Sequence, residues 1–532
     1  MDRLPTNLQT TTYDVIVIGA GINGAGISRD AAMRGLKVLL LDKGDIGSGT
    51  SSWSTRLIHG GLRYLEHGEF GLVRESLRER EVLLRIAPHL VRPLPLLLPI
   101  YRGAGRGKWT IRAGMLAYDA LSFDKTLPRH RMLSPAEARQ QAPGINSEGL
   151  VGAAVYCDAQ VEFAERLVWE SALSAREHGA TVITYARVDR FIFEAETIAG
   201  VAFSNELQGT TESARANFII NAAGPWIDQV LSQSAPGSLR LIGGTKGSHL
   251  IVAPFPGAPA AALYTEAQAD RRPFFIIPWN GNYLIGTTDV RYEGDLDRVR
   301  IEREEVDYLL HETNQLIPAA NLTREKILYT YSGVRPLPFI NQKEARSITR
   351  RHFIREHPQY RNLLSIVGGK LTTYRSLSEE VVDLIFRKMG GNSPECSTGK
   401  QPLPGAMTSD FKIFAKEFRV ANSLPPRVSE RLLRIYGTRA QEVVELVSQD
   451  PALGETFSNG GDALAAEVVY SFTRETATTL ADCLLRRTML GLNPSRGIGA
   501  DVAVAEIACR HLGWSAARAE REVSDYRQYH LR

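Results

Sequence analysis

The stretch YDVIVIGAGING, from Tyr13 to Gly24, decides the fold of this chain of 532 residues. An apolar run leads into a GxGxxG turn, an alanine-rich segment follows, and a second apolar run ends at Asp42. These periodicities predict strand, turn, helix and strand, which together form a βαβ unit. The first glycine allows the tight turn, the second lets the backbone approach a pyrophosphate, and the third lets the helix pack on the strand. The stretch predicts a dinucleotide-binding domain with Gly19, Gly21 and Gly24 at the cofactor.

Asp42 supports this interpretation. It stands 23 residues after Gly19, where a carboxylate accepts hydrogen bonds from the hydroxyls of an adenosine ribose. The alternative is a chance glycine-rich turn beside a surface aspartate, and the complete βαβ context disfavours it. The unit does not separate FAD from NAD. No second GxGxxG follows a strand elsewhere in the chain, so a separate nicotinamide domain is not predicted.

Composition narrows the class of protein. The length and the 43% of hydrophobic residues predict two or three domains with large cores. The 63 basic and 59 acidic residues are too balanced for a nucleic-acid-binding protein. The four cysteines lie far apart, so neither a metal site nor a disulfide framework is expected, and a reducing cytoplasmic compartment fits. We expect no signal peptide, and no apolar segment approaches the roughly 20 residues of a membrane-spanning helix.

Further motifs follow in a recognisable order. They are Thr50-Ser51-Ser52, Gly60-Gly61, a turn from Asn221 to Gly224, and the sequence GTTD from Gly286 to Asp289. Together they resemble the FAD-dependent oxidoreductases of the D-amino-acid oxidase and glycine oxidase superfamily. This resemblance implies FAD as the cofactor.

A second set of motifs is more specific. The sequence LIHGGLRYLEH, from Leu57 to His67, resembles the aerobic glycerol-3-phosphate dehydrogenases, bacterial and mitochondrial. The resemblance extends along the chain through KGSH (Lys246 to His249), TYSGVRPL (Thr330 to Leu337), GGKLTTYR (Gly368 to Arg375) and LLRRT (Leu484 to Thr488). It implies noncovalently held FAD, glycerol 3-phosphate as substrate, a quinone as electron acceptor and a homodimer. One departure is Asp42, where many relatives carry glutamate, and either residue can hold a ribose.

The expected fold is α/β, with a Rossmann-like FAD-binding domain, an interleaved substrate domain built on a mixed β-sheet, and a C-terminal all-α domain. Residues 1–400 contain the first two domains. The FAD-binding domain comprises mainly 13–90, 205–245 and 340–388, and the substrate domain mainly 91–204 and 246–339. A stretch dense in Gly, Pro and Ser from Met389 to Met407 reads as a linker. The helical cap domain then spans 401–532, with helices expected at 428–436, 440–447, 463–490 and 501–512.

The expected cofactor contacts extend beyond the first turn. Leu363 to Val367 is predicted as a strand, Gly368-Gly369 as a turn, and Leu371 onward as a helix whose first N–H groups face the isoalloxazine carbonyl. The complete predicted set is Gly19, Gly21, Gly24, Asp42, Thr50, Ser51, Ser52, Gly60, Gly61, Gly224, Gly368, Gly369, Leu371 and Thr372. No metal ligand is expected.

Oxidation of a secondary alcohol by a flavin requires loss of the hydroxyl proton and transfer of a hydride to flavin N5, with the substrate phosphate held in place. Arg63 and Arg335 lie in motifs that resemble the family's substrate pocket, and a planar guanidinium suits bidentate phosphate binding. Tyr64 adds a phenolic donor, and Lys370 lies at the Gly-Gly turn against substrate or flavin. A structural salt bridge is the alternative role for either arginine.

His249 is the predicted general base, because imidazole titrates near working pH and the KGSH stretch is expected to enter the pocket. The alternative is a hydrogen-bonded core histidine. His59 competes for the same role, or supports the Gly-Gly turn. The predicted catalytic set is therefore His249, Arg335, Lys370 and Arg63, and the predicted substrate-binding set is Arg63, Tyr64, Arg335 and Lys370.

A possible membrane contact follows the run LPLLLPI from Leu94 to Ile100. Arg102, Arg106, Lys108, Trp109 and Arg112 come next, followed by apolar residues 115–118. Basic groups beside tryptophan and apolar side chains are typical of a segment that lies on anionic lipid. The alternative is a core strand followed by a solvated basic loop. The expected location is cytoplasmic, peripherally attached to the inner face of the cell membrane.

Three other functions compete with the quinone-linked dehydrogenase. A glycerol-3-phosphate oxidase would perform the same half-reaction with oxygen as acceptor. A flavin-binding scaffold or redox sensor would need no anion pocket. An amine or amino-acid oxidase would lack the His-Gly-Gly-Leu-Arg-Tyr pattern of residues 59–64.

Overall fold

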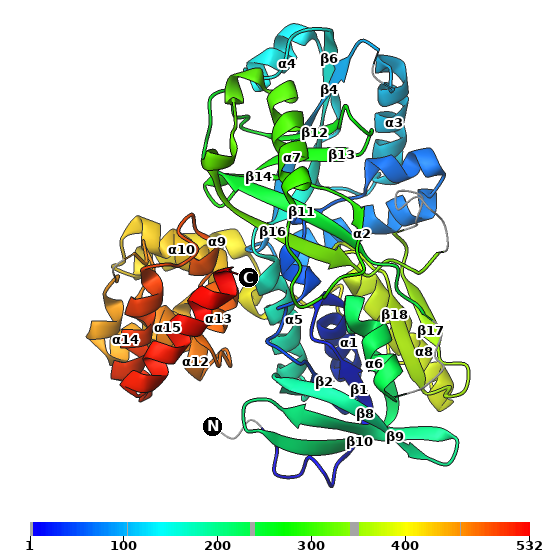
Figure 1. The fold of residues 1–532 in the computed structure, drawn as a ribbon, viewed down its shortest axis with the longest axis vertical. Coiled ribbons are helices and arrows are strands. Elements are labelled where there is room, and N and C mark those ends of the chain that lie inside the picture. The colour runs from blue at the N-terminus through cyan, green and yellow to red at the C-terminus, as the bar shows by residue number, and fades with distance from the viewer. Residues whose placement is uncertain (1–3, 104, 235–239, 341–349, 458, 532) are drawn as a thin grey trace.

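The computed structural model describes residues 4–103, 105–234, 240–340, 350–457 and 459–531. Two β-sheets lie one above the other, and a group of helices lies against their side (Figure 1). The predicted fold class is confirmed: a Rossmann-like α/β unit, a mixed second sheet and a C-terminal helical domain.

The first sheet contains eight strands in the order β17-β18-β10-β1-β2-β7, with β8 and β9 extending it from β10. The pairs β1–β2, β1–β10, β10–β18 and β2–β7 are parallel. The strands are β1 (Thr12–Ile18), β2 (Val38–Leu41), β7 (Thr181–Ile183), β8 (Ala186–Glu194), β9 (Thr197–Asn205), β10 (Thr210–Asn221), β17 (Phe353–Glu356) and β18 (Leu363–Val367).

Each face of this sheet is covered. Val15 and Val17 of β1 point into a core formed with helices α1 (Ile22–Met33), α5 (Ala164–Glu177) and α8 (Tyr374–Met389). Ile16 and Ile18 point to the other side, where the β8–β9 hairpin and α6 (Ile227–Ser234) cover the sheet. Because a strand alternates its side chains between faces, an unbroken apolar run such as β1 is buried on both sides.

The second sheet contains ten strands in the order β15-β11-β14-β13-β12-β4-β6-β3, with β16 paired to β11 and β5 to β6. Only β4 and β12 are parallel among the described pairs, so the sheet is mixed. Its strands are β3 (Leu57–Ile58), β4 (Val91–Tyr101), β5 (Arg131–Leu133), β6 (Leu150–Val161), β11 (Thr245–Val252), β12 (Ala262–Glu266), β13 (Pro273–Trp279), β14 (Asn282–Gly286), β15 (Val290–Arg291) and β16 (Ile327–Arg335). Helices α2 (Phe70–Ile86), α3 (Lys108–Leu121), α4 (Pro135–Gln141) and α7 (Arg303–Leu316) accompany it.

The membership of the sheets differs at two places from the expected division of the chain. Residues 181–204 were assigned to the substrate domain, but β7, β8 and β9 belong to the first sheet. The reason is that α5 returns the chain to the edge of that sheet, where β7 pairs with β2 in parallel. Conversely, β3 lies in the second sheet although 13–90 was assigned to the first domain. Residues 341–349 of the expected range 340–388 lie outside the described residues.

The C-terminal domain is helical, as expected. Its helices are α9 (Phe411–Ala421), α10 (Pro426–Tyr436), α11 (Ala440–Gln449), α12 (Ala465–Thr473), α13 (Leu480–Asp482), α14 (Ala500–Leu512) and α15 (Ala516–Leu531). The single helix expected at 463–490 was wrong: α12 ends at Thr473, and Thr479 starts a new helix by accepting a hydrogen bond from the Asp482 N–H. A π-helical turn, Cys483–Arg487 (η10), continues α13.

Candidate functional site

A cavity of about 1620 Å³ lies between the two sheets and the C-terminal helices. That volume exceeds the 300 to 1,000 Å³ or so of a typical small-ligand pocket, so it suits a dinucleotide together with a substrate. Most of the predicted site residues line it. They are Gly19, Gly21, Asp42, Thr50, Ser51, Gly61, Arg63, Tyr64, Gly224, His249, Arg335, Gly368, Gly369, Lys370, Leu371 and Thr372.

The glycine turn follows β1 as the sequence pattern requires. Gly19 has a φ of +102°, and a Cβ there would lie 2.7 Å from the Ala222 carbonyl oxygen. A Cβ on Gly24 would lie 1.8 Å from the Gly19 carbonyl oxygen, so Gly24 packs helix on strand and does not line the cavity. Gly21 is the N-cap of α1, and as a glycine it has no side chain to cap the helix. The positive end of α1 is therefore open to a phosphate in the cavity.

Asp42 closes β2 beside this turn. Its carboxylate accepts hydrogen bonds from the N–H groups of Ala20 at 2.5 Å and Gly44 at 2.8 Å. Burial raises the pKa of Asp42, while those two hydrogen bonds lower it. Each carboxylate oxygen has a second lone pair for a ribose hydroxyl.

The Thr50-Ser51-Ser52 motif forms a 3₁₀ turn at the same end of the cavity. Thr50 Oγ1 donates to the Val334 carbonyl at 2.8 Å. Ser51 Oγ accepts from the Ile22 N–H at 3.0 Å, at the start of α1. Ser52 points away from the cavity and donates to the Gly47 carbonyl. Thr50 and Ser51 therefore present hydroxyls to the cavity, and Ser52 holds the turn.

The two Gly-Gly motifs have different roles. Gly60 lies behind the wall: its N–H donates to Tyr118 Oη at 3.0 Å, and a Cβ would lie 2.5 Å from that oxygen. Gly368 and Gly369 follow β18 with φ values of +80° and +98° and line the cavity. The helix expected from Leu371 begins later, at Tyr374, because residues 370–373 form a turn closed by the Thr373 N–H and the Lys370 carbonyl.

Several buried polar atoms at the cavity have no hydrogen-bond partner among the described residues, and Asn23 Oδ1 and Trp226 Nε1 are two of them. Buried polar groups in folded proteins are nearly always hydrogen-bonded. Together with the glycine N-cap of α1 and the close-packed glycines, they fit a bound dinucleotide.

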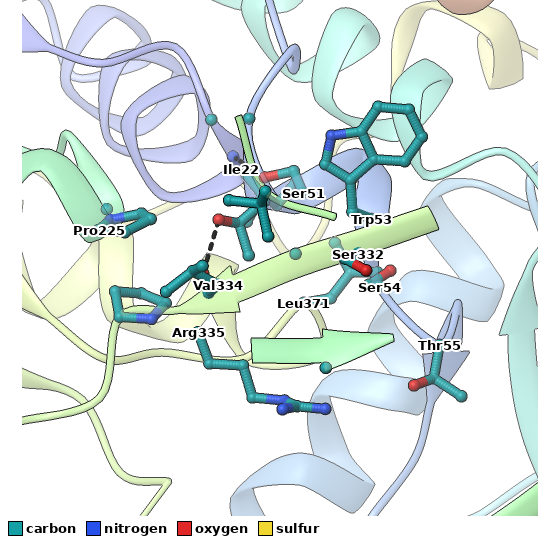
Figure 2. A pocket seen from close by; sticks show the side chains of 18 of the residues that line it. Ile22, Ser51, Trp53, Ser54, Thr55, Pro225, Ser332, Val334, Arg335 and Leu371 are labelled. Carbon is teal, nitrogen blue, oxygen red and sulfur yellow. Dashed lines mark hydrogen bonds between the residues drawn. The ribbon is translucent and has the colours of Figure 1, made fainter. Parts of the chain in front are cut away.

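A different set of side chains gathers where β11 and β16 meet the cavity. Arg335 donates to Asp289 at 3.1 Å and to Thr287 Oγ1 at 3.0 Å, and Arg350 donates to the other Asp289 oxygen at 2.9 Å. Burial would raise the pKa of Asp289, but the two arginines outweigh it and the pKa is lowered. Burial lowers the pKa of Arg335, which Asp289 opposes. One carboxylate thus fixes two guanidinium groups at the cavity, and Figure 2 shows Arg335 extending from the end of β16.

Three more side chains lie on the same wall of the cavity as Arg335: Lys370, Tyr64 and Arg63. Lys370 Nζ lies 3.9 Å from the centre of the Tyr64 ring and 3.3 Å from Ser76 Oγ. Burial lowers the pKa of Lys370 to about 7, with Glu75 and Glu69 opposing that shift. Arg63 also lines the cavity, where its guanidinium can meet a ligand.

Both candidate histidines line the cavity and are neutral near neutral pH. Burial, then Arg335 and Arg56, hold the pKa of His249 well below its usual value. Its Nε2 lies 2.9 Å from Thr55 Oγ1, and its Nδ1 has no partner among the described residues. Burial lowers the pKa of His59 to about 4. The His59 backbone N–H donates to Thr372 Oγ1, so His59 also supports the second Gly-Gly turn.

Sequence reasoning missed Arg350, Asp289 and Thr55 as site residues. Arg350 lies outside the recognised motifs, so no local pattern marked it. Asp289 stood in the GTTD motif, but its role as the bridge between two arginines depends on β11, β15 and β16 coming together. Thr55 stands three residues after Ser52 of the Thr50-Ser51-Ser52 motif, and only the fold brings it to His249.

Two family models match the chain. Residues 14–375 match the FAD dependent oxidoreductase family, and residues 396–519 match the C-terminal domain of alpha-glycerophosphate oxidase. The first match alone spans more than half of the chain.

Full-length relatives agree. The chain is 48% identical over 536 residues to a glycerol-3-phosphate dehydrogenase of Synechocystis sp., covering 98% of this chain and 97% of that protein. It is 40% identical over 490 residues to D-erythritol 1-phosphate dehydrogenase of Brucella abortus, covering 90% and 94%. Among solved structures, the glycerol-3-phosphate dehydrogenase of Bacillus halodurans complexed with FAD matches with a TM-score of 0.79 and 27% identity, covering 98% of this chain and 95% of that one.

Proposed function

This chain belongs to the family of FAD-dependent oxidoreductases, with FAD as its cofactor, and from that premise we propose that it oxidises sn-glycerol 3-phosphate to dihydroxyacetone phosphate. The observation that supports the proposal is the pair Arg335 and Arg350, held on the two oxygens of Asp289 in the cavity that contains the glycine turn. A fixed pair of guanidinium groups matches the oxygens of a phosphate dianion. Relatives named for two polyol phosphates match this chain in sequence over nearly their full length.

Substrate binding is the first task of the side chains. Arg335 and Arg350 bind the phosphate group of the substrate, while Arg63, Tyr64 and Lys370 bind its polyol part. These contacts fix the C2–H bond of the substrate and shut out water, which reduces the entropy lost on reaching the transition state. Bound FAD supplies flavin N5 as the acceptor for the hydride that leaves C2.

His249 is the base in this proposal. In the tautomer whose Nε2–H donates to Thr55, Nδ1 keeps a lone pair and accepts the proton of the C2 hydroxyl. Its lowered pKa keeps the ring neutral, as a base must be before it accepts a proton. Replacing His249 by Asn should lower kcat more than it raises KM. An equal loss on replacing His59 by Asn, with none at His249, would move the role to His59.

The substrate test is anaerobic mixing of the holoprotein with candidate alcohols, followed by the visible flavin spectrum. Glycerol 3-phosphate should bleach the band at micromolar to millimolar concentration, whereas glycerol should leave it unchanged because it lacks the phosphate. Stronger bleaching by D-erythritol 1-phosphate would reassign the substrate within the polyol phosphates. A flavin spectrum that changes with neither glycerol 3-phosphate nor D-erythritol 1-phosphate would refute the proposal.

The acceptor in this proposal is a membrane quinone, and attachment is by helix α3. The run Leu94 to Ile100 lies in strand β4 and is mostly buried, so the proposed contact lies in the segment after it. Trp109, Leu116 and Phe123 recur every seven residues on or just after α3 and are 74%, 56% and 78% exposed. Lys108 and Arg112 are exposed beside them. An apolar stripe with flanking cations is suited to an anionic lipid surface.

No described helix is long and apolar enough to cross a membrane. Binding to vesicles with and without anionic lipid tests the α3 attachment, with Trp109→Ser and Leu116→Ser together as the variant. Lost sedimentation with anionic vesicles is expected, while bleaching by substrate in detergent stays intact. Reoxidation by a soluble quinone with little peroxide would favour the quinone, and rapid oxygen consumption would favour the oxidase.

A further inference from the structure

We infer that the C-terminal helical domain is part of the FAD site: its side chains Arg486 and Asp482 hold the loop from Asp42 to Gly49 in the form that binds the adenosine half of the cofactor. The domain lies against the side of the two sheets in Figure 1. Ala481, Leu485 and Arg486 from this domain line the same cavity as Lys43, Asp45 and Tyr185. The inference concerns cofactor binding and does not depend on which alcohol is oxidised.

The central contact is Asp45, which is 1% exposed and accepts from two arginines of the helical domain. Arg486 Nε lies 2.6 Å from Asp45 Oδ2, and Arg487 Nη1 and Nη2 lie 2.9 Å and 2.8 Å from the two carboxylate oxygens. Burial alone would raise the pKa of Asp45, but Arg487 and Arg486 outweigh burial and lower it. Asp45 is therefore ionised, and both its oxygens are occupied.

The two arginines are consecutive, and their turn explains how both reach one carboxylate. Residues Cys483–Arg487 form a π-helical turn. Neighbouring residues on an α-helix point about 100° apart, and the wider π turn changes that spacing. π-Helical turns are rare in proteins, and those that occur are often found at functional sites.

Hydrogen bonds lead from these arginines to the ribose-binding carboxylate. Arg486 Nη2 also donates to Asp482 at 2.6 Å, and the Tyr185 hydroxyl donates to the same Asp482 oxygen at 2.7 Å. The Tyr185 N–H donates to the Gly44 carbonyl at 3.0 Å, and the Gly44 N–H donates to Asp42. The Ala186 N–H donates to the Asp42 carbonyl at 2.7 Å. A continuous chain of hydrogen bonds therefore connects the helical domain, through the loop, to Asp42.

A second buried ion pair between the same two parts provides a matched control. Arg166 of α5 and Glu475 of the helical domain form two hydrogen bonds of 2.7 Å, and both side chains are fully buried. Neither residue lines the cavity. Breaking either pair leaves buried arginine charge unpaired and loosens the same interface, but only the Asp45 contact holds the cofactor loop.

The test measures the dissociation constant of FAD from the holoprotein by the fluorescence of released flavin on dilution, alongside the Tm. Asp45→Asn should raise that constant by about tenfold or more. Glu475→Gln should lower the Tm comparably while changing the constant by less than about threefold. Equal changes of the constant in the two variants, or an unchanged constant in Asp45→Asn, would overturn the inference.

Tyr185→Phe keeps the test decisive if Asp45→Asn does not fold. It removes only the hydroxyl that joins Asp482 to the cavity wall. Loss of a hydrogen bond to a charged group predicts a rise of about tenfold in the FAD dissociation constant. A Tyr185→Phe protein that holds FAD as tightly as the wild type would contradict the role assigned to the helical domain.

Discussion

The two ends of the cavity, which we propose bind the phosphates of the cofactor and of the substrate, are built from different groups. At the cofactor end, glycine backbone and the N-terminus of α1 surround the space, and Ser51 accepts from one N–H group of that helix. At the substrate end, Arg335 and Arg350 provide guanidinium groups, and Lys370 provides an amine whose pKa is lowered to about 7. Backbone groups do not titrate and are fixed by the strand and helix that contain them. Side chains are more mobile, a lysine charge titrates, and the arginines need partners such as Asp289 to hold them in position.

This difference predicts how each end fails. At the cofactor end, FAD binding is lost for steric reasons, because a single added carbon would overlap the backbone. At the substrate end, loss of a charge lowers the affinity for the substrate or changes the pH dependence of the reaction, while the fold stays intact. Substitutions at both ends separate the two kinds of failure.

The largest effect is expected from Gly24→Ala. The new Cβ would lie 1.8 Å from the Gly19 carbonyl oxygen, so α1 must move away from β1. We expect purified protein with little or no flavin, measured by the ratio of the visible flavin band to protein absorbance. Gly114→Ala in α3 is the control, because nothing lies within 4 Å of its added Cβ. Normal flavin content in Gly24→Ala would show that the backbone does not fix this end.

Arg335→Ala comes second. It removes a guanidinium fixed by Asp289 and Thr287, and loss of a charged, hydrogen-bonded phosphate contact costs about 2 to 5 kcal/mol. KM for the phosphorylated substrate should rise roughly a hundredfold, with FAD still bound. Arg215→Ala removes an exposed arginine paired with Glu194 and should leave steady-state kinetics unchanged. A kcat loss with unaltered KM would remove Arg335 from phosphate binding.

Arg350→Ala should have a smaller effect of the same kind. Asp289 keeps Arg335 in place when Arg350 is removed, so part of the phosphate site survives. KM should rise about tenfold. The double variant should show less than the summed free-energy loss, because both arginines share one carboxylate. Strict additivity would mean that the two guanidinium groups act independently.

Much of the cofactor end was predictable from local sequence. The GxGxxG turn, the strand before it and Asp42 lie within one short βαβ unit, and the steric role of each glycine follows from position alone. Gly24, Ser52 and Gly60 were expected at the cofactor but pack behind the cavity wall, Gly24 in the helix–strand packing role that its motif position predicts. Which face of a turn meets the ligand depends on neighbours far away in sequence, such as Tyr118 against Gly60.

The substrate end was predictable only in part, because its contacts are long-range. Motifs marked Arg63, Arg335 and Lys370, and all three line the cavity. Arg350 reaches Asp289 across 61 residues, and Thr55 reaches His249 across 194. Pairings of that kind depend on sheet register, which residue pattern does not give. The broken helix at 463–490 failed for a local reason, the cap at Thr479 inside an apolar run.

The pH dependence distinguishes the substrate end from the cofactor end. Burial lowers the pKa of Lys370 to about 7. If Lys370 binds the substrate as a cation, kcat/KM is full below that pKa and falls about tenfold per unit as pH rises above it. Lys370→Arg should abolish the fall, because arginine stays charged. A kcat/KM that rises through pH 7 would instead make neutral Lys370 the base in place of His249.

The smallest effect is expected from Ser51→Ala, which tests whether side chains contribute at the cofactor end at all. Ser51 Oγ accepts from the Ile22 N–H at 3.0 Å and lines the cavity, whereas neighbouring Ser52 donates to the Gly47 carbonyl behind the wall. Losing one such hydrogen bond costs about 1 kcal/mol, so the FAD dissociation constant should rise roughly fivefold. Ser52→Ala should lower the Tm with a smaller change in FAD binding. If both variants raise the FAD dissociation constant equally, Ser51 acts only by holding its turn, and binding at the cofactor end depends on the backbone alone.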